Sequence, residues 1–240
     1  MKRLEMAHYF ITGHTGFKGA WLILLLKARG HEVSGLSLDP LPGSIFDRAG
    51  LKHDLVHDFR ADVRNREETL SAMRLAQPDF VIHMAAQALV RESYVRPSYT
   101  YEVNVNGTLS VLEAIEHTDS VKSHLVVTSD KVYRDHDVGR PFVEMDALGG
   151  RDPYGASKAM ADLLAQEHLQ RAGSKPGTVV RAGNVVGFGD VSKDRLFSDI
   201  FRALEEGVSL RIRNRNHVRP WQHVLDCLTG YLWILHNRRR

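Results

Sequence analysis

Segment 12–19 constrains the fold of this 240-residue chain more than any other feature, because its three glycines stand at regular intervals between a predicted strand and a predicted helix. Gly13 permits a tight turn, Gly16 lets the backbone approach an anion closely, and Gly19 lets the helix pack against the sheet. Free N–H groups at the start of the helix face that anion, which suits the pyrophosphate of a dinucleotide. The spacing G-x-x-G-x-x-G differs from the more common G-x-G-x-x-G, and a purely structural turn is the alternative interpretation.

Short runs of β-branched or aromatic residues alternate with longer helical stretches along most of the chain. Such alternation is typical of βαβ units, whose parallel strands form a sheet that helices cover on both faces. We therefore predict an α/β fold, a Rossmann-type doubly wound parallel sheet, over residues 1–182. The predicted strands are 9–12, 32–38, 55–57, 80–84, 125–128 and 178–181, and the predicted helices are 17–29, 66–76, 103–117 and 154–171.

This regular alternation ends near residue 181, after which three glycines crowd into a loop. The loop is followed by a predicted helix at 194–206, a short predicted strand at 209–213 and a last amphipathic helix at 224–236. We expect residues 183–240 to form an incomplete C-terminal substrate lobe, interleaved with the last elements of the sheet domain.

The composition excludes several classes of protein. Apolar residues make up 43% and charged residues 25%, unlike a disordered tail, a collagen-like fibre or a membrane bundle. The longest apolar run, 20–26, is too short for a bilayer, which needs about 20 residues. Lys and Arg number 32 against 29 Asp and Glu, so the net charge is only +3, and no nucleic acid is expected even at the alternating arginines of 211–215. The 13 histidines lack metal-ligand spacing, so no metal is expected, and the single cysteine fits a reducing, cytoplasmic compartment.

Acidic residues after two of the predicted strands are candidate contacts for a dinucleotide. Asp39 lies 20 residues past Gly19, where a carboxylate accepts hydrogen bonds from ribose hydroxyls and repels a 2′-phosphate, which favours NAD over NADP. A turn residue before Pro40 is the alternative. Asp62 and Val63 follow the third strand, where they either contact the adenine or cap a helix.

Two polar groups are candidate catalytic machinery. Tyr154 and Lys158 share one face of a predicted helix, and a nearby ammonium is expected to lower the tyrosine pKa by roughly 3 units, so that the phenol can take a proton from a sugar hydroxyl. Ser129, Asp130 and Lys131 place a hydroxyl, a carboxylic acid and an amine at the carboxyl end of a strand, where open α/β sheets bind ligands. An ordinary polar exit from a strand is the alternative.

These motifs resemble those of the extended short-chain dehydrogenase/reductases that act on nucleotide sugars. That resemblance rests on Thr12-Gly13-x-x-Gly16-Phe17-x-Gly19, His83-Met84-Ala85-Ala86-Gln87, Asn104-x-x-Gly107-Thr108 and Tyr154-x-x-x-Lys158. Within that family, four further segments are similar to the CDP-glucose 4,6-dehydratases. These segments are 13–19, 128–133, 181–187 and Arg219-Pro220-Trp221-Gln222-His223-Val224.

The resemblance implies an NAD-dependent dehydration of CDP-glucose. Tyr154, helped by Ser129 and Lys158, would remove the C4 hydroxyl proton while hydride leaves C4. Asp130 would be the acid for water loss from C6. Lys131 stands where the related dTDP-glucose 4,6-dehydratases have Glu, and it would either be the C5 base in its neutral form or orient a water that acts as this base. The implied NAD contacts are Gly13, Thr15, Gly16, Phe17, Gly19, Asp39, Asp62, Val63, Ala85, Ala86, Gln87, Asn104, Thr128, Tyr154 and Lys158.

The resemblance also implies that Asn184 and Arg219 touch the nucleotide diphosphate, since the planar fork of an arginine binds two phosphate oxygens at once. It implies a homodimer paired through helices 103–117 and 154–171, and a place in deoxysugar biosynthesis such as that of O-antigen. Members of the family continue past the last predicted helix, so the chain is expected to be truncated at its C-terminus. A 4-epimerase or dehydratase for another nucleotide sugar, or an NAD-binding protein without turnover, are the alternatives.

Overall fold

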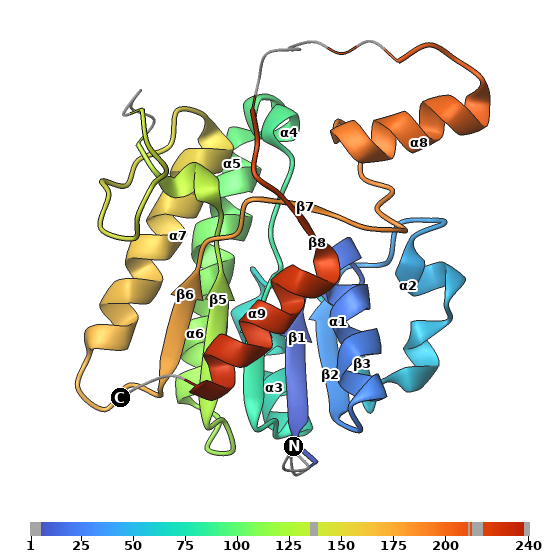
Figure 1. Cartoon of the computed structure of the whole chain (residues 1–240). Helices are drawn as coiled ribbons and strands as arrows, with labels where there is room; N and C mark the ends of the chain where they lie inside the picture. Colours follow the sequence, from blue (N-terminus) through green and yellow to red (C-terminus); the bar gives the residue numbers. More distant parts are fainter. Residues whose placement is uncertain (1–5, 135–138, 211, 213–217, 238–240) are drawn as a thin grey trace.

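The computed structural model describes residues 6–134, 139–210, 212 and 218–237. Six parallel strands form the main sheet in the order β3-β2-β1-β4-β5-β6, which confirms the predicted doubly wound Rossmann-type sheet (Figure 1). Because β1 lies between β2 and β4, the strand order reverses beside it, and ligands bind at such a point in open α/β sheets. The strands are β1 (His8–Thr12), β2 (Glu32–Ser37), β3 (His57–Arg60), β4 (Phe80–His83), β5 (Ser123–Val127) and β6 (Gly177–Val180).

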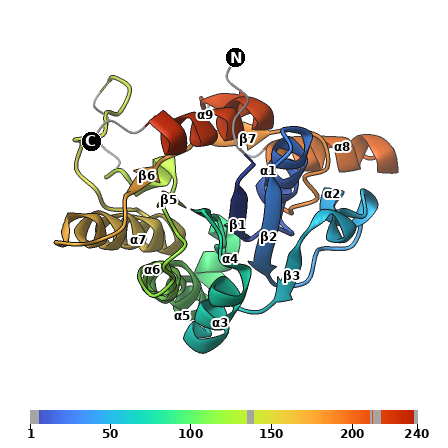
Figure 2. The same ribbon diagram turned by 90° about the horizontal axis from the view of Figure 1, so that it is seen from below.

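Helices cover both faces of this sheet (Figure 2). Strand β1 shows why, because Tyr9, Phe10 and Ile11 are fully buried and successive side chains point to opposite faces. Tyr9 and Ile11 belong to the core formed with α1 and α9, whereas Phe10 belongs to the core formed with α3 and α6. The helices are α1 (Phe17–Ala28) and α9 (Val224–Asn237) on one face, and α3 (Arg66–Ala76), α6 (Gly107–Glu116) and α7 (Pro153–Gln170) on the other.

Short elements between the strands were not predicted. The predicted helix 103–117 begins as a π-helical turn, Glu102–Asn106, before α6, and two short helices, α4 (Val90–Val95) and α5 (Pro97–Tyr101), precede it. The third strand is longer than predicted and lies further along the chain. Further short helices are α2 (Ile45–Arg48), Leu51–Asp54 and Asp130–Val132.

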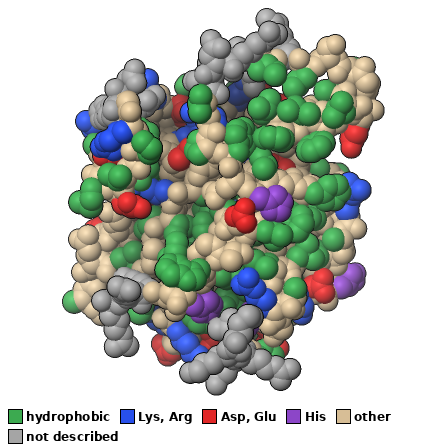
Figure 3. Space-filling model, viewed as in Figure 1, with side chains coloured by type: hydrophobic (Ala, Val, Ile, Leu, Met, Phe, Trp, Pro, Cys, Tyr) green, Lys and Arg blue, Asp and Glu red, His purple; other side chains and the backbone are tan. Residues whose placement is uncertain are grey.

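The C-terminal part contributes both to the main core and to the carboxyl edge of the sheet. Helix α9 packs against α1, and its buried residues include Leu228 and Tyr231. Strands β7 (Asn184–Val186) and β8 (Trp221–His223) form a separate parallel pair, and α8 (Leu196–Glu206) lies above the carboxyl edge. Hydrophobic side chains gather over α8 in Figure 3, where Leu204 is 74% exposed. Residues 209, 210 and 212 of the predicted strand 209–213 are described and do not form a strand. The arginines at 211, 213 and 215 lie outside the described residues.

Among the described residues, none of the helices combines the length and the apolar character that crossing a bilayer requires. Within the same ranges, His, Cys, Asp and Glu side chains form no group of three that could hold a metal ion.

Candidate active site

Two cavities open at the carboxyl edge of the main sheet. The larger, of about 980 Å³, lies between the ends of β4 and β5, the start of α7 and helix α8. The smaller, of about 260 Å³, lies over the glycine turn. The two share part of their walls, including Lys18, Met84, Ala86 and Arg195, so ligands in the two cavities would lie side by side.

Most of the predicted site residues line these cavities. All five predicted catalytic residues and both predicted diphosphate contacts line the larger one, although they come from segments up to 90 residues apart in the sequence (129 to 219). These residues belong to several different motifs, which the fold brings together at one cavity. The larger cavity is lined by Thr128, Ser129, Asp130, Lys131, Tyr154, Lys158, Ala86, Asn184 and Arg219, and the smaller by Gly13, Thr15, Gly16, Phe17, Gly19, Asp62, Val63, Ala85 and Ala86.

The glycine turn forms a close-fitting cradle at the start of α1. Gly13 has a φ of +75°, and a Cβ there would lie 2.8 Å from the backbone nitrogen of Ala85. A Cβ on Gly19 would lie 2.4 Å from the carbonyl oxygen of Gly13, so both positions require glycine. The residue before the helix is Gly16, and no side chain caps the first N–H groups of α1. These N–H groups are therefore free to bind an anion.

Asp39 lies directly after two residues that line the smaller cavity. Strand β2 ends at Ser37, and Ser37 and Leu38 line the smaller cavity, whereas Asp39 does not. The Asp39 side chain is 91% exposed and lies 3.8 Å from the Nε atom of Arg60. The strand ends two residues before this carboxylate, and the contact of Asp39 with the ribose stays a prediction.

Asp62 is held by Arg64, whose backbone N–H donates to one carboxylate oxygen at 2.9 Å and whose guanidinium binds the other. Burial acts to raise the pKa of Asp62, but the hydrogen bonds and charge of Arg64 outweigh it and keep the pKa below its usual value. The residue that caps α3 is Asn65, through its bond to the N–H of Glu68, so Asp62 is not the helix cap.

Gln87 and Asn104 are buried and bind each other instead of lining either cavity. Asn104 accepts from the Gln87 N–H at 2.9 Å and donates to its carbonyl at 3.1 Å and to the Ser157 hydroxyl at 2.8 Å. The amide of Asn104 is thereby occupied, and both residues position the loop after β4. The cavity walls come from Ala85 and Ala86 in that loop.

Tyr154 and Lys158 stand one helical turn apart in α7, 9% and 5% exposed. Burial raises the pKa of Tyr154, while a hydrogen bond with Ser129 and the charge of Arg195 act in the opposite direction. The predicted lowering of this pKa by Lys158 is therefore wrong, because the burial of the phenol outweighs the neighbouring cations. Burial and the charge of Lys18 lower the pKa of Lys158 to about 7, and its ammonium donates to the Val127 carbonyl at 3.2 Å.

Ser129, Asp130 and Lys131 begin a short helical turn directly after β5. The Ser129 hydroxyl donates to Asp130 at 3.1 Å and accepts from the Lys131 N–H at 3.2 Å, which fixes the backbone of this turn. Asn184 and Arg219 meet because the Asn184 N–H donates to the carbonyl of Pro220 at 3.1 Å. The pairing of β7 with β8 thus brings these two motifs to one wall of the larger cavity.

Sequence reasoning missed two cationic residues that line both cavities, Lys18 and Arg195. Lys18 lies inside the glycine turn and donates to the hydroxyl of Tyr231 on α9 at 3.0 Å, and burial lowers its pKa. The position of Lys18 between two glycines was a signal that could have marked it. Arg195 precedes α8 without any recognisable motif, and only the folded chain brings its charge near Tyr154.

Comparison with known proteins places this geometry in a family. Residues 9–240 match the model of the NAD dependent epimerase/dehydratase family. The chain is 41% identical over 235 residues to CDP-glucose 4,6-dehydratase of Salmonella typhimurium, covering 94% of this chain but 65% of that protein. The chain thus spans slightly less than two thirds of the length of this curated relative.

Solved structures share the fold. The dTDP-glucose 4,6-dehydratase DesIV from Streptomyces venezuelae, with NAD bound, superposes with a TM-score of 0.86 at 26% identity, covering 97% of this chain and 73% of that one. The UDP-glucose 4-epimerase of Thermus thermophilus, in complex with NAD, superposes with a TM-score of 0.81 at 26% identity, covering 96% of this chain and 75% of that one. The chain therefore belongs to the NAD dependent epimerase/dehydratase family.

Proposed function

We propose that this chain binds NAD and dehydrates a nucleotide-activated hexose, converting CDP-glucose to CDP-4-keto-6-deoxyglucose. The observation that carries the proposal is the convergence of Tyr154, Lys158, segment 129–131, Asn184 and Arg219 on one cavity beside the glycine cradle. The similarity to CDP-glucose 4,6-dehydratase supports the choice of substrate.

The glycine cradle fits the pyrophosphate of NAD. Gly13 and Gly19 leave no room for a side chain, and the uncapped N–H groups of α1 offer donors to an anion. Thr15, Ser37 and Asp62 extend the same cavity toward the ends of β2 and β3, where they would hold the adenosine. When bound, NAD supplies the chemistry of accepting a hydride from C4 of the sugar and returning it to C6.

Tyr154 would take the proton of the C4 hydroxyl. A phenol with a raised pKa is a poor base unless something stabilises its anion, and Ser129 and Arg195 act in that direction. Asp130 would give a proton to the departing C6 hydroxyl, and Lys131 would take the C5 proton or orient a water that does so. Both line the larger cavity next to Tyr154.

The role of Lys131 has its own test. Replacing Lys131 by Met should diminish exchange of the C5 proton with solvent while hydride removal from C4 continues. Undiminished exchange would show that another group is the base.

We also propose a cytoplasmic homodimer that acts in deoxysugar synthesis such as that of O-antigen. Leu163 and Met160 on α7 are 54% and 49% exposed, which supports pairing through this helix, whereas Leu112 of α6 is fully buried within the monomer. The division into a sheet domain, 1–182, and a substrate region, 183–240, remains part of the same proposal.

One assay tests the proposed activity against its alternatives. The protein is incubated with NAD and CDP-glucose, and the sugar products are identified by NMR, with Tyr154→Phe as the inactive control. A 4-keto-6-deoxy product is the expected result. A 4-epimer would instead support the epimerase alternative, for which the similarity to UDP-glucose 4-epimerase is the supporting observation. Tight NAD binding without any product would support a binding protein.

A further inference from the structure

Arg181 follows β6 directly and is linked to both ends of the segment 128–133, which carries Ser129, Asp130 and Lys131. It contacts Tyr133 directly and reaches Thr128 through Asp162. Its side chain is 12% exposed. The proposed mechanism gives this arginine no role, and it does not line either cavity.

The first contact is with Asp162 of α7, whose side chain is fully buried. The Arg181 Nε and Nη2 atoms bind its two carboxylate oxygens at 2.8 and 2.7 Å, a bidentate pair. The Thr128 hydroxyl donates to the same carboxylate at 2.8 Å. Asp162 therefore links Arg181 to the start of the segment, one residue before Ser129.

The second contact is with Tyr133, at the other end of the segment. The Arg181 Nη1 atom donates to the Tyr133 hydroxyl at 3.1 Å, and the guanidinium carbon lies 5.0 Å from the centre of its ring. The same Nη1 atom donates to the carbonyl of Glu144 at 2.9 Å, and Tyr133 stacks on Phe142 at 4.8 Å. One guanidinium thus anchors the end of the segment and the loop that follows it.

A buried ion pair of this kind is costly to disrupt, because removing one partner leaves an uncompensated charge. Burial acts to raise the pKa of Asp162, but its hydrogen bonds from Arg181, Thr128 and Gln166 outweigh burial and keep the carboxyl ionised. The carboxylate is therefore a fixed charge, and Thr128 is held to it.

We propose that Arg181 is a positioning residue that holds the segment 128–133, so that Ser129, Asp130 and Lys131 keep their places on the cavity wall that Tyr154 also lines. This inference rests on the proposed function, since Tyr154 is the base only in that reaction. Ser129 lies between the two anchored ends, and a misplacement of about 1 Å in a catalytic group can lower a rate by about 100-fold.

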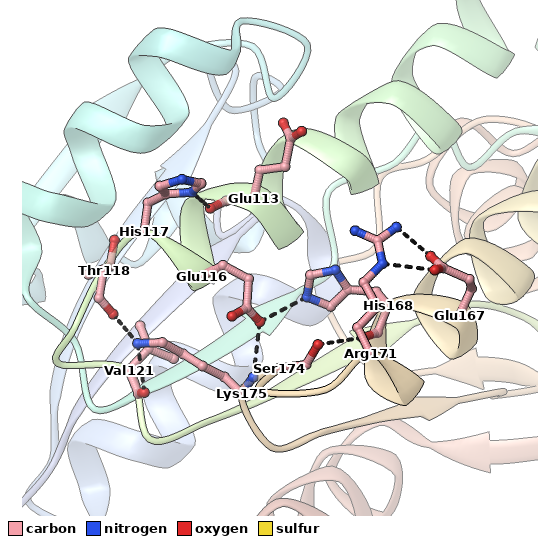
Figure 4. Close-up of polar contacts among 10 residues, drawn as sticks. All are labelled: Glu113, Glu116, His117, Thr118, Val121, Glu167, His168, Arg171, Ser174 and Lys175. Carbon is pink, nitrogen blue, oxygen red and sulfur yellow. Dashed lines mark hydrogen bonds and ion pairs between the residues drawn. The ribbon is translucent and has the colours of Figure 1, made fainter.

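Helix α7 carries a second arginine–carboxylate pair that serves as a matched control (Figure 4). Arg171 binds Glu167 one turn away, and both side chains are more than half exposed, at 54% and 56%. Arg171→Lys replaces a guanidinium by an ammonium, as Arg181→Lys does, but on the surface and away from segment 128–133.

The test compares Arg181→Lys with Arg171→Lys by NMR of protein with isotope-labelled tyrosine rings, the Tyr154 resonance being assigned with Tyr154→Phe. Arg181→Lys should move the Tyr154 resonance, because the segment that shares the cavity wall with this ring is displaced, and Arg171→Lys should leave it in place. With CDP-glucose, Arg181→Lys should reduce bound NAD about 10- to 100-fold more slowly while NAD affinity stays within about twofold. An unmoved Tyr154 resonance in Arg181→Lys would overturn the proposal.

The NMR result does not require turnover, so failure of the wild-type protein to act on CDP-glucose would count against the proposed function alone. Should Arg181→Lys fail to fold, Tyr133→Leu removes only the second anchor and leaves the buried pair with Asp162 in place. The same displacement of the Tyr154 resonance is then expected in Tyr133→Leu, and its absence in a folded variant would contradict the proposal.

Discussion

At the amino edge of the main sheet, where α6 and α7 end, polar side chains bind one another, whereas at the carboxyl edge they line cavities (Figures 1 and 4). At the amino edge, Glu116 accepts from the His168 Nε2 atom and from the Lys175 N–H, each at 3.0 Å. The Lys175 ammonium donates to the carbonyls of Thr118 and Val121. This cluster closes the ends of the helices onto the sheet.

The carboxyl edge holds charges that the fold does not neutralise in this way. Lys158 is buried there and Lys18 is half-buried, both with lowered pKa values, and the phenol of Tyr154 has a raised pKa. Perturbed groups gathered beside a cavity indicate a functional site, while a cluster such as that of Glu116, hydrogen-bonded and away from both cavities, indicates structure. Both edges contain buried polar residues, so burial alone does not mark the site. The two edges differ in what their polar residues contact.

The largest expected effect is on Tyr154. Tyr154→Phe should slow the reduction of bound NAD by CDP-glucose by about 100- to 10,000-fold, because the base for the C4 hydroxyl is lost. NAD affinity and the denaturation midpoint should change little. Stopped-flow absorbance of the reduced nicotinamide measures the rate, and wild-type speed in the variant would assign the proton transfer to another group.

The next largest effects are expected for two glycine substitutions, one at each edge of the main sheet. An alanine Cβ at Gly19 would overlap the backbone of Gly13 and His14, so Gly19→Ala should weaken NAD binding by about 10- to 100-fold. At the amino edge, a Cβ at Gly177 would overlap the ring of His124, so Gly177→Ala should lower stability but leave NAD affinity within about twofold. Fluorescence titration with NAD checks both, and equal losses of affinity would contradict the comparison.

Lys158 should make stability depend on pH. Folded Lys158 loses its proton near pH 7, while the unfolded chain keeps it up to about the ordinary value of 10.5, so the unfolded chain binds more protons between these limits. The contribution of Lys158 to stability therefore rises with pH through this window. Between about pH 7 and pH 9, the free energy of unfolding of Lys158→Met should rise by about 1–2 kcal/mol less than that of the wild type, as measured by urea unfolding.

The matched control for this experiment is Lys27→Met, at the exposed end of α1, which should follow the wild-type pH dependence. If Lys158→Met and Lys27→Met show the same pH dependence, Lys158 does not titrate as inferred from its burial.

The smallest effect on NAD binding is expected at the amino edge. Glu116→Ala leaves the buried His168 ring and the Lys175 N–H without their acceptor, and should lower the free energy of unfolding by about 1–3 kcal/mol. Its NAD affinity should equal that of the wild type. A loss of NAD binding in the folded variant would show that the two edges are coupled.

The sequence predicted the sheet well, because its strands are buried on both faces and read as apolar runs such as Tyr9–Ile11. The side chains proposed to be catalytic could be selected from the sequence in part because their spacing follows helix geometry, as with Tyr154 and Lys158. Asp39 could not be placed, since a strand end two residues earlier moves a side chain from the cavity wall to the surface.

Long-range contacts could also not be predicted from the sequence. Arg195 lies in a segment without a distinctive pattern, and the resemblance of segment 181–187 did not say what Arg181 contacts. Their neighbours Tyr154 and Asp162 are about 20 to 40 residues away along the chain. The direction of the Tyr154 pKa shift depends on burial, which only the packed structure provides. Local spacing and the family resemblance therefore predicted the candidate residues that line the larger cavity, and tertiary packing determined their ionisation and support.

The most direct test of the account follows one hydride. The protein is loaded with NAD and mixed with CDP-glucose deuterated at C4, and the position of deuterium in the product is determined by NMR. We predict a 4-keto-6-deoxy sugar that carries the deuterium at C6, because the hydride taken from C4 returns to the same sugar. Deuterium found at C4 of an epimer, or left at C4 of unreacted sugar while NAD stays bound and oxidised, would contradict the account.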